Sequence, residues 1–485
     1  MEKRELRRAV VIVAVFCVAC VLASPAQTFK TILSFDGTQG STPLAGVIQG
    51  SNGSLYGETV ANGPYGGGTV FRIRPTGSST AIYSFCSQPG CTDGESPYSG
   101  LLLSIDGNYY GATESGGAFG DGAIFKLTPS GSVTTLYSFT GGSDGRLPST
   151  LVEAADGSFY GTTSLGANVC IGYGCGTVFR ITRNGVLTTL WQFCGQTNCP
   201  DGGEPYGVVE GGDGNFYGTT SVGGAQSWGT VFKISPAGEL TTLYNFCTQT
   251  NCVDGSGPEG LVLGSDGNFY GTTYFDGPNG VGTIFRISPQ GTFTALYNFC
   301  TRQNCVDGAR PSARLIQAND GNFYGTTFDG GSADRGVIFR MTPSGVYTVL
   351  HNFCTQANCT DGSYPEAPVM EGTDGVFYGT TLYGGIINNT TCIDSCGTVF
   401  RLSVGLSPFV RPVPSGGKIG RVVPILGNNL DGTTGVTFNG VPATFTVVAS
   451  TLITATVPAG ATTGTIEVTS PSGTLSSNAP FRVLP

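Results

Sequence analysis

The sequence predicts an all-β protein: a seven-bladed β-propeller closed by an N-terminal strand, followed by an immunoglobulin-like β-sandwich. Three observations lead to this fold class. The 485 residues include 78 glycines and only 11% charged residues, which is typical of many short strands joined by tight turns. One block of about 54 residues recurs seven times. A copy of the last strand of that block stands alone at the beginning of the chain.

Residues 1–26 have the pattern of a secretory signal peptide. Basic residues between Lys3 and Arg8 precede an apolar run from Ala9 to Leu22, and small residues follow. The run is too short to cross a bilayer comfortably, so we expect no membrane helix in the mature chain. Lipidation at Cys20 is the alternative to free release. We therefore expect a secreted or cell-surface protein, and we expect it to be a monomer.

Each repeat contains four strand-like stretches separated by turn signals. The second stretch resembles Asp266-Gly-Asn-Phe-Tyr-Gly-Thr-Thr273, and the third resembles Gly176-Thr-Val-Phe-Arg-Ile181. Asp-Gly before the second stretch and Pro-x-Gly after the third supply tight-turn chemistry. The phenylalanine of the third stretch recurs at Phe71, Phe125, Phe179, Phe232, Phe285, Phe339 and Phe400. Four antiparallel strands per repeat of this length predict one propeller blade.

The ends of the repeat array predict a closed ring. Residues 30–37 match a fourth strand, although no first strand precedes them, and the last copy has strands one to three only. An N-terminal strand that completes the last blade would remove two exposed sheet edges. We therefore predict a propeller over residues 27–405.

The tail, residues 406–485, has a different composition, with no cysteine and with alternating Val, Thr and Gly. Its stretches Gly427-Asn-Asn-Leu430, Val436-Thr-Phe-Asn-Gly440 and Gly464-Thr-Ile-Glu-Val468 resemble an IPT/TIG domain. The repeat strings resemble the GloVer tandem repeat of bacterial exported proteins. These resemblances imply an immunoglobulin-like spacer or interaction module on a surface-exposed or secreted protein, and they transfer no catalytic residue.

Of the 16 cysteines, two lie in the predicted signal peptide and the others fall into seven close pairs. In an oxidising compartment, local pairs predict short disulfide-closed loops. Zinc would need four clustered ligands, so we do not expect it. The predicted pairs are Cys86–Cys91, Cys170–Cys175, Cys194–Cys199, Cys247–Cys252, Cys300–Cys305, Cys354–Cys359 and Cys392–Cys396.

The long loops and all cysteine pairs are expected on one face of the propeller, which predicts a binding face. Aromatic residues that differ between repeats suggest a surface on which sugars stack, and we select Tyr65, Tyr173, Trp228, Tyr274 and Tyr383 as ligand contacts. The aspartates that follow the fourth strands are each followed by glycine, so turn stabilisation explains them. We expect no cofactor, with calcium on these carboxylates as the alternative.

Polar residues that break the repeat are the candidates for catalysis: Glu58, Glu114, Glu204, Arg314, Asp334, Arg335 and Glu366. The single histidine, His351, replaces a core tyrosine and argues against Ser-His-Asp chemistry. A net charge of -9 opposes nucleic-acid binding. The sequence therefore predicts an exported protein that binds a glycan, another extracellular polymer or a surface protein through the loop face. A carbohydrate-active hydrolase or lyase and a purely structural surface protein are the alternatives.

Overall fold

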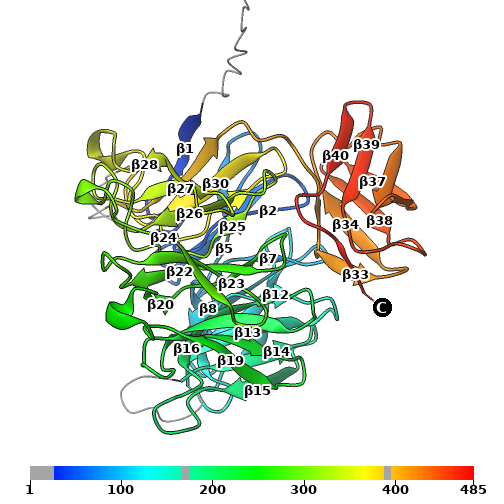
Figure 1. The fold of residues 1–485 in the computed structure, drawn as a ribbon. Coiled ribbons are helices and arrows are strands. Elements are labelled where there is room, and N and C mark those ends of the chain that lie inside the picture. Colours follow the sequence, from blue (N-terminus) through cyan, green and yellow to red (C-terminus); the bar gives the residue numbers. More distant parts are fainter. Residues whose placement is uncertain (1–26, 167–174, 387–394, 485) are drawn as a thin grey trace, which may run out of the picture.

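The computed structural model describes residues 27–166, 175–386 and 395–484, so the predicted signal peptide lies outside the described residues. The fold is all-β and propeller-like (Figure 1). Within described residues 28–403, the strands form seven antiparallel sheets. We number these sheets 1 to 7 in the order of their second strands, and we call residues 28–403 the repeat region and residues 406–484 the tail.

Every sheet runs from a first to a fourth strand. The first strands are β2 (Ile48–Gln49), β6 (Glu95–Pro97) with β7 (Leu102–Leu103), β11 (Arg146–Pro148) with β12 (Val152–Glu153), β16 (Gly203–Glu210), β20 (Ser256–Pro258) with β21 (Val262–Leu263), β25 (Ile316–Gln317) and β29 (Met370–Glu371). The second strands are β3 (Leu55–Thr59), β8 (Tyr109–Ser115), β13 (Phe159–Leu165), β17 (Phe216–Val222), β22 (Phe269–Phe275), β26 (Phe323–Thr327) and β30 (Val376–Thr381).

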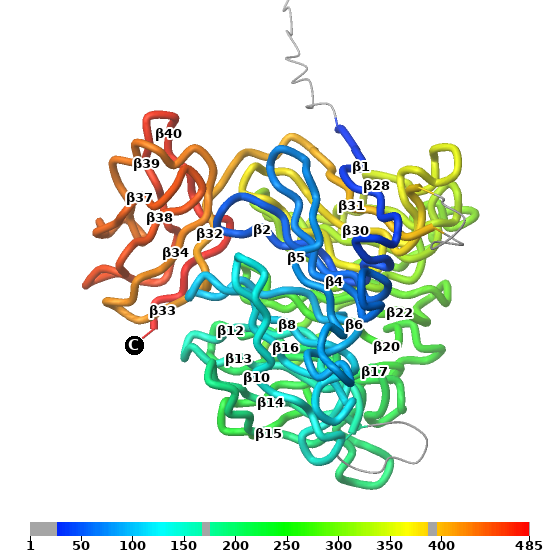
Figure 2. The backbone as a smooth tube through the Cα atoms, turned by 180° about the vertical axis from the view of Figure 1, so that it is seen from behind, coloured from blue at the N-terminus to red at the C-terminus, as the bar shows by residue number. Residues whose placement is uncertain are grey.

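The third strands are β4 (Thr69–Ile73), β9 (Ala123–Leu127), β14 (Thr177–Ile181), β18 (Thr230–Ile234), β23 (Thr283–Ile287), β27 (Val337–Met341) and β31 (Thr398–Ser403). The fourth strands of sheets 1 to 6 are β5 (Ser79–Ser84), β10 (Val133–Ser138), β15 (Leu187–Gln192), β19 (Leu240–Asn245), β24 (Phe293–Asn298) and β28 (Tyr347–Asn352). The fourth strand of sheet 7 is β1 (Thr28–Ser34), which pairs antiparallel with β31 (Figure 2).

The repeated Tyr-Gly-Thr of the second strand is explained by packing within each sheet. The glycine pairs with the buried phenylalanine of the third strand, as Gly161 pairs with Phe179. A Cβ atom on Gly161 would lie 2.7 Å from Cζ of that ring. Only glycine leaves room for the ring, which fills the middle of the sheet.

The tyrosine of the same motif packs each sheet against the next. Tyr160 of sheet 3 stacks on Phe216 of sheet 4 with ring centroids 3.9 Å apart, and sheets 1 to 6 all make this contact. In sheet 7, Tyr378 packs in one cluster with Leu55 of sheet 1. Sheet 7 thus contacts sheet 1 as each other sheet contacts its successor.

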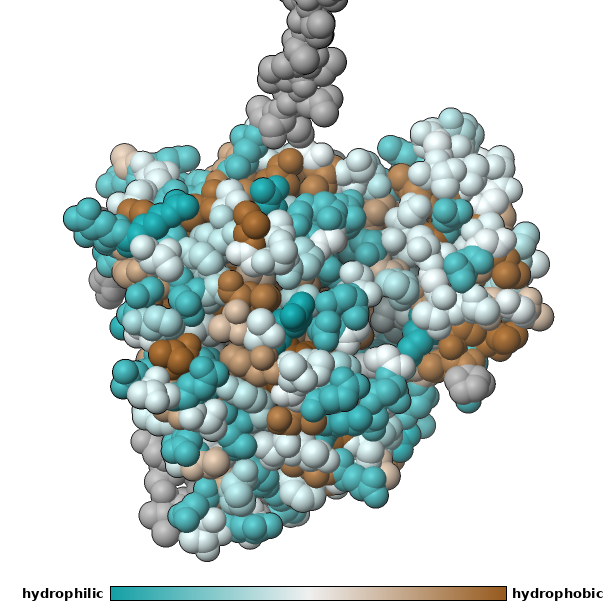
Figure 3. Space-filling view, in the orientation of Figure 1, coloured by the Kyte–Doolittle hydropathy of each residue, from teal (hydrophilic) through white to brown (hydrophobic). Residues whose placement is uncertain are grey.

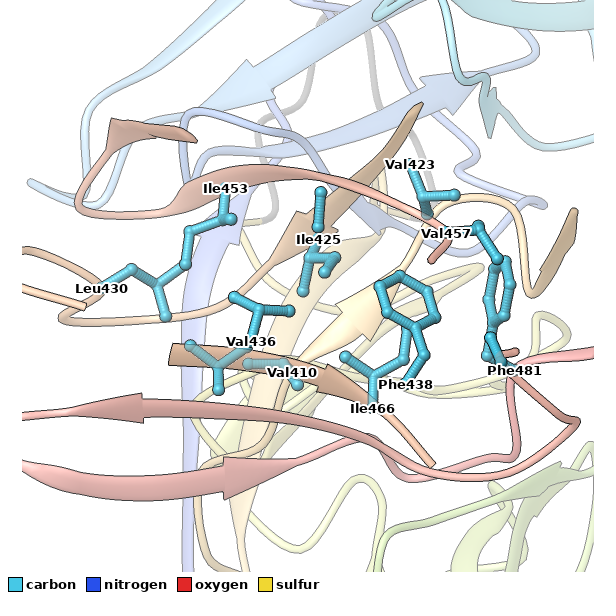
Figure 4. Packing of buried hydrophobic residues seen from close by; sticks show 13 residues of the cluster. Val410, Val423, Ile425, Leu430, Val436, Phe438, Ile453, Val457, Ile466 and Phe481 are labelled. Atoms are coloured by element: carbon cyan, nitrogen blue, oxygen red, sulfur yellow. The ribbon is translucent and has the colours of Figure 1, made fainter. Parts of the chain in front are cut away.

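The tail contains two four-stranded sheets and one parallel pair. One sheet is β32 (Arg411–Pro412), β34 (Val422–Leu426), β38 (Leu452–Thr456) and β37 (Phe445–Ala449); the other is β36 (Val441–Pro442), β35 (Gly435–Phe438), β39 (Ile466–Ser470) and β40 (Gly473–Ser476). The parallel pair is β33 (Gly416–Lys418) with β41 (Arg482–Leu484). Aliphatic and phenylalanine side chains from both sheets, among them Ile425 and Phe438, form one core (Figure 4).

Arginines fix the tail to the turns between the first and second strands of sheets 3 and 4. Arg482 contacts Glu210 and the carbonyl of Gly211, and Arg421 donates to the carbonyl of Ala155 at 3.1 Å.

Exposed apolar patches are scattered over the face shown in Figure 3 rather than joined in one band. None of the described segments forms a helix long and apolar enough to span a membrane.

Candidate functional site

A cavity of about 410 Å³ lies where the first strands of all seven sheets meet. Its walls include aliphatic side chains such as Leu102, Ile316 and Met370, and it also reaches Arg411 and Asn478 of the tail. This size and mixture of apolar wall and few polar groups are typical of small-ligand sites. We call it the axial cavity.

The backbone of each repeat turns sharply before it lines this cavity. The residue before the first-strand proline has φ between 53° and 60° in all seven repeats, and six of these seven residues are not glycine. This conformation is uncommon for residues with a side chain. The same residues donate a backbone hydrogen bond to the preceding sheet, as Glu204 does to Cys175 and Thr42 does to Cys396 of sheet 7.

One position contributes a residue to the cavity wall from every sheet. It directly precedes the aliphatic residue that anchors the first strand, such as Leu315 in sheet 6. Six of the seven residues there are small or proline, and only sheet 6 carries a charge. The position is occupied by Gly46, Gly100, Thr150, Gly207, Gly260, Arg314 and Pro368.

Two tyrosines and Glu366 add polar groups to the cavity, and Glu259 lies beside one of these tyrosines. Tyr98, Tyr206 and Glu366 line it, and the Tyr206 hydroxyl interacts with the carboxyl group of Glu259. Tyr98 and Tyr206 line the cavity and are still 37% and 38% exposed to solvent. Water therefore reaches this cavity.

The ionisable groups of the axial cavity have shifted pKa values. Burial and, to a smaller extent, the charge of Glu366 together raise the pKa of Glu259 to about 8, although the hydrogen bond from Tyr206 opposes this rise. Burial also raises the pKa of Glu366. The negative charge of Glu259, followed by burial, holds the pKa of Tyr206 well above its usual range. Near neutral pH, Glu259 is therefore largely protonated, and it can donate as well as accept hydrogen bonds.

The tail borders one end of the axial cavity. Arg411 donates to the backbone carbonyl of Glu371, and both residues line the cavity. Burial raises the pKa of Glu371 to about 7, while Arg411 opposes the rise.

Aromatic and charged residues gather on the loops of sheets 6 and 7. Arg310 and Asp329 form an ion pair at 2.9 Å, and the Arg335 guanidinium lies 5.0 Å from the ring centroid of Tyr364. Tyr364 also packs against Phe328, with ring centroids 4.8 Å apart. Such a cluster combines stacking surfaces with hydrogen-bond donors.

The described members of the aromatic set selected from the sequence do not line the axial cavity. Tyr65 and Trp228 are 60% and 47% exposed and lie on loops between second and third strands of sheets 1 and 4. Tyr274 lies at the end of β22, and Tyr383 packs edge-on against Tyr364 with centroids 6.0 Å apart. Tyr173 lies outside the described residues. The four described residues come from four different sheets, namely sheets 1, 4, 5 and 7.

The structure also separates the polar residues that break the repeat. Arg314 and Glu366 line the axial cavity. Glu58 is buried between sheets 1 and 2, where its Oε2 accepts from the amide of Gly100 at 2.9 Å. The other four lie outside the cavity: Glu114 is exposed, Glu204 accepts from Ser221, Asp334 accepts from the amide of Gly330, and Arg335 stacks on Tyr364.

Sequence analysis missed Tyr98, Tyr206 and Glu259. Each directly follows the first-strand proline, so that position was the available signal. The repeats do not align at this position, because sheets 3 to 5 have one residue fewer between this proline and the anchoring aliphatic residue. The equivalence of these three residues was therefore not visible in the sequence.

Five of the expected disulfides are present in the described residues: Cys86–Cys91, Cys194–Cys199, Cys247–Cys252, Cys300–Cys305 and Cys354–Cys359. Cys170 and Cys392, each one member of an expected pair, lie outside the described residues. Four of the loops contain short 3-10 turns: η1 (Pro89–Cys91), η2 (Thr250–Cys252), η3 (Gln303–Cys305) and η4 (Ala357–Cys359).

The aspartates behind these loops accept hydrogen bonds from neighbouring side chains and amides. Asp307 accepts from the Tyr297 hydroxyl at 2.6 Å and from the amide of Thr301 at 2.9 Å. Asp254 and Asp93 accept from the corresponding tyrosines, and Asp201 accepts from the indole of Trp191. These contacts are those of a stabilised turn.

Comparison with known proteins places the repeats in a family. The model of the Gloeobacter/Verrucomicrobia repeat matches residues 20–199 and 171–393. The chain belongs to this repeat family. The IPT/TIG domain model matches residues 410–483 of this Gloeobacter/Verrucomicrobia repeat protein, so its tail is an IPT/TIG domain. Both resemblances expected from the sequence are thereby confirmed. No curated protein matches the chain.

Solved structures resemble this chain at low sequence identity. The extracellular domain of a protein named a hybrid two component system from B. thetaiotaomicron has a TM-score of 0.50 and 12% identity, over 94% of this chain and 58% of that chain. A second such domain from the same organism has a TM-score of 0.49 and 12% identity, over 95% of this chain and 60% of that one. A protein named a 6-phosphogluconolactonase from Bacteroides uniformis has a TM-score of 0.45 and 18% identity, over 67% and 88% of the two chains. This chain spans less than two thirds of the length of either extracellular domain.

Proposed function

We propose that this protein is exported and binds a glycan, with the end of the glycan in the axial cavity and the following sugars on the loop face. The observation that carries the proposal is the axial cavity itself. The cavity is open to water and its walls are largely aliphatic. Tyr98, Tyr206 and Glu366 bring hydroxyl and carboxyl groups to it, and Glu259 interacts with the Tyr206 hydroxyl. Aromatic rings beside such groups suit sugars, which combine apolar ring faces with many hydroxyls.

The proposed setting is extracellular. The five disulfides of the described loops suit an oxidising compartment, and the basic and apolar residues at the beginning of the chain suit a signal peptide. One comparison, with a TM-score of 0.50, is with the extracellular domain of a protein named a hybrid two component system, and a binding role outside the cell fits that likeness.

The proposed scaffold is a closed ring of seven blades in which β1 acts as the clasp. Two contacts support closure. The tyrosine of sheet 7 packs on sheet 1. The Thr380 hydroxyl of sheet 7 also donates to the carbonyl of Ala45 at 3.1 Å, as Thr326 does to Ala367 between sheets 6 and 7. A closed ring gives the axial cavity a rigid wall, which favours pre-organised binding.

A glycan array probed with the mature protein tests the function. We expect at least one polysaccharide to bind, and we expect Tyr206→Ala to weaken that binding at least tenfold. Val448→Ala, an exposed change on the tail, serves as the control and should bind like the wild type. Absence of binding to every glycan would refute the proposal.

A second function, glycan cleavage, is favoured by one observation. Glu259, with its pKa raised to about 8, faces the Tyr206 hydroxyl, and this pair could transfer a proton at neutral pH. Product release from the glycan that binds would distinguish the two functions. If the protein is an enzyme, Glu259→Gln should abolish release while retaining binding.

A further inference from the structure

Arg314 is the only charged residue among seven equivalent positions in the wall of the axial cavity. The other six sheets place glycine, threonine or proline there. These short residues keep the axis open, so the Arg314 side chain enters a space that no equivalent side chain fills. Gly260 of the neighbouring sheet makes room for it, because a Cβ atom on Gly260 would lie 3.3 Å from Cβ of Arg314.

Within the described part of the chain, no ion pair or hydrogen bond engages the Arg314 guanidinium. The charge that acts on Arg314 is that of the Tyr206 hydroxyl when it is ionised. Tyrosine is neutral at physiological pH, so it does not compensate the arginine. The other arginine of the cavity, Arg411, contacts the carbonyl of Glu371, and the carboxylate of that residue also acts on its charge.

Arg314 is exposed to the water of the cavity, so its guanidinium is accessible to a negatively charged group of a ligand. Arginine binds a carboxylate through two parallel hydrogen bonds. The groups nearby are hydroxyls and carboxyls that suit sugar hydroxyls rather than further negative charge, namely Tyr98, Tyr206 and Glu366. A ligand with one negative charge among many hydroxyls fits this arrangement.

We propose that Arg314 binds the carboxylate of a uronic acid, so that the ligand of the axial cavity is the end of an acidic glycan. This inference rests on the proposed function and specifies its ligand class. Tyr98 and Glu366 then contact ring hydroxyls of the same sugar.

The test is titration calorimetry of the mature full-length protein with uronate trisaccharides. The panel contains galacturonate, mannuronate and guluronate, each beside its carboxyl-reduced neutral form, and a sulfated trisaccharide. We expect at least one uronate to bind tenfold or more tightly than its reduced form. Arg314→Gln should remove that preference and change binding of the reduced form less than twofold. Arg314→Lys, which keeps the charge but loses the two-pronged geometry, should give an intermediate affinity.

Two outcomes would overturn the inference and leave glycan binding intact: neutral forms that bind as well as uronates, or a sulfated sugar that binds in place of the carboxylated ones. Failure of every saccharide in the panel and on the glycan array would overturn the proposed function as well. If Arg314→Gln does not fold, the salt dependence of wild-type binding decides. Affinity for the uronate should fall as salt rises while affinity for the reduced form stays constant, and equal behaviour of both forms would refute the role of Arg314.

Discussion

Acid should loosen the contact between β1 and sheet 6, because this contact is built on the single histidine. His351 in β28 stacks on Phe29 of β1, with ring centroids 3.7 Å apart and an angle of 6° between the planes. It occupies the place of Tyr297 in the preceding repeat, where the hydroxyl donates to Asp307. The Nε2 atom of His351 lies 3.8 Å from Asp361 and makes no hydrogen bond.

The size of the acid effect follows from the pKa of His351. Burial lowers this pKa from 6.5 to about 4, although Asp361 opposes the shift. The unfolded chain therefore takes up the proton first, and stability is lost as the pH falls from about 6.5 towards 4. At pH 5 the loss is about 2 kcal/mol, given 1.36 kcal/mol for each pKa unit.

Urea unfolding at pH 7.5 and at pH 5.0 measures this loss. Both tryptophans, Trp191 and Trp228, lie in the repeat region, so their fluorescence reports on the repeats rather than on the tail. His351→Tyr restores the hydroxyl that sheets 1, 2, 4 and 5 carry at this position, and His351→Phe removes the titration without restoring it. We expect the wild type to lose about 2 kcal/mol more than either variant between the two pH values. Parallel losses in all three proteins would refute the reasoning.

Three further predictions concern the scaffold. Deletion of residues 27–37 should destabilise the repeat region as a whole, and Phe29→Ala, which loses contacts with β28 and β31, should cost about 2–4 kcal/mol; an unchanged urea midpoint in the deletion variant would contradict the clasp. Burial raises the pKa of Glu58 from 4.5 to about 8, so its contribution is present below pH 4.5 and is lost as the pH rises through 8. Glu58→Gln should remove that dependence between pH 5 and pH 9 in the same assay, and an unaltered slope would exclude Glu58 as its source. The ion pair between Arg482 and Glu210 is mostly buried, so Arg482→Gln should release the tail to limited proteolysis. A double-mutant cycle with Glu210→Gln should give a coupling of about 1–3 kcal/mol, whereas zero coupling would mean that the pair does not hold the tail.

Much of the fold could be predicted because its rules are local and repeated. Each repeat places a glycine opposite a phenylalanine, as Gly161 does opposite Phe179, and the same packing demand therefore appears seven times in the sequence. The unpaired strand at the beginning of the chain also had one available partner. β1 pairs with β31 in the structure, as the missing fourth strand of the last repeat predicted.

The candidate site could be predicted only in part, because its residues come from different sheets. Arg314 and Glu366 attracted attention as breaks in the pattern, and both line the axial cavity. Glu58 broke the pattern equally clearly, yet it replaces a threonine on the face between two sheets and is fully buried. Sequence alone does not distinguish a residue that faces the next sheet from one that faces the axis. The two differ only in the direction in which the side chain leaves the backbone.

A symmetric ring requires such breaks if it is to orient a ligand. Seven identical residues around an axis would offer a sugar seven equivalent poses and no preferred one. Here sheet 6 supplies Arg314, sheet 7 supplies Glu366, and sheets 2 and 4 supply Tyr98 and Tyr206, so charge and hydroxyls are distributed unequally around the cavity. A carboxylate held at sheet 6 would fix the rotation of the sugar about the axis, and the hydroxyls that then meet sheets 2, 4 and 7 would decide which uronic acid fits.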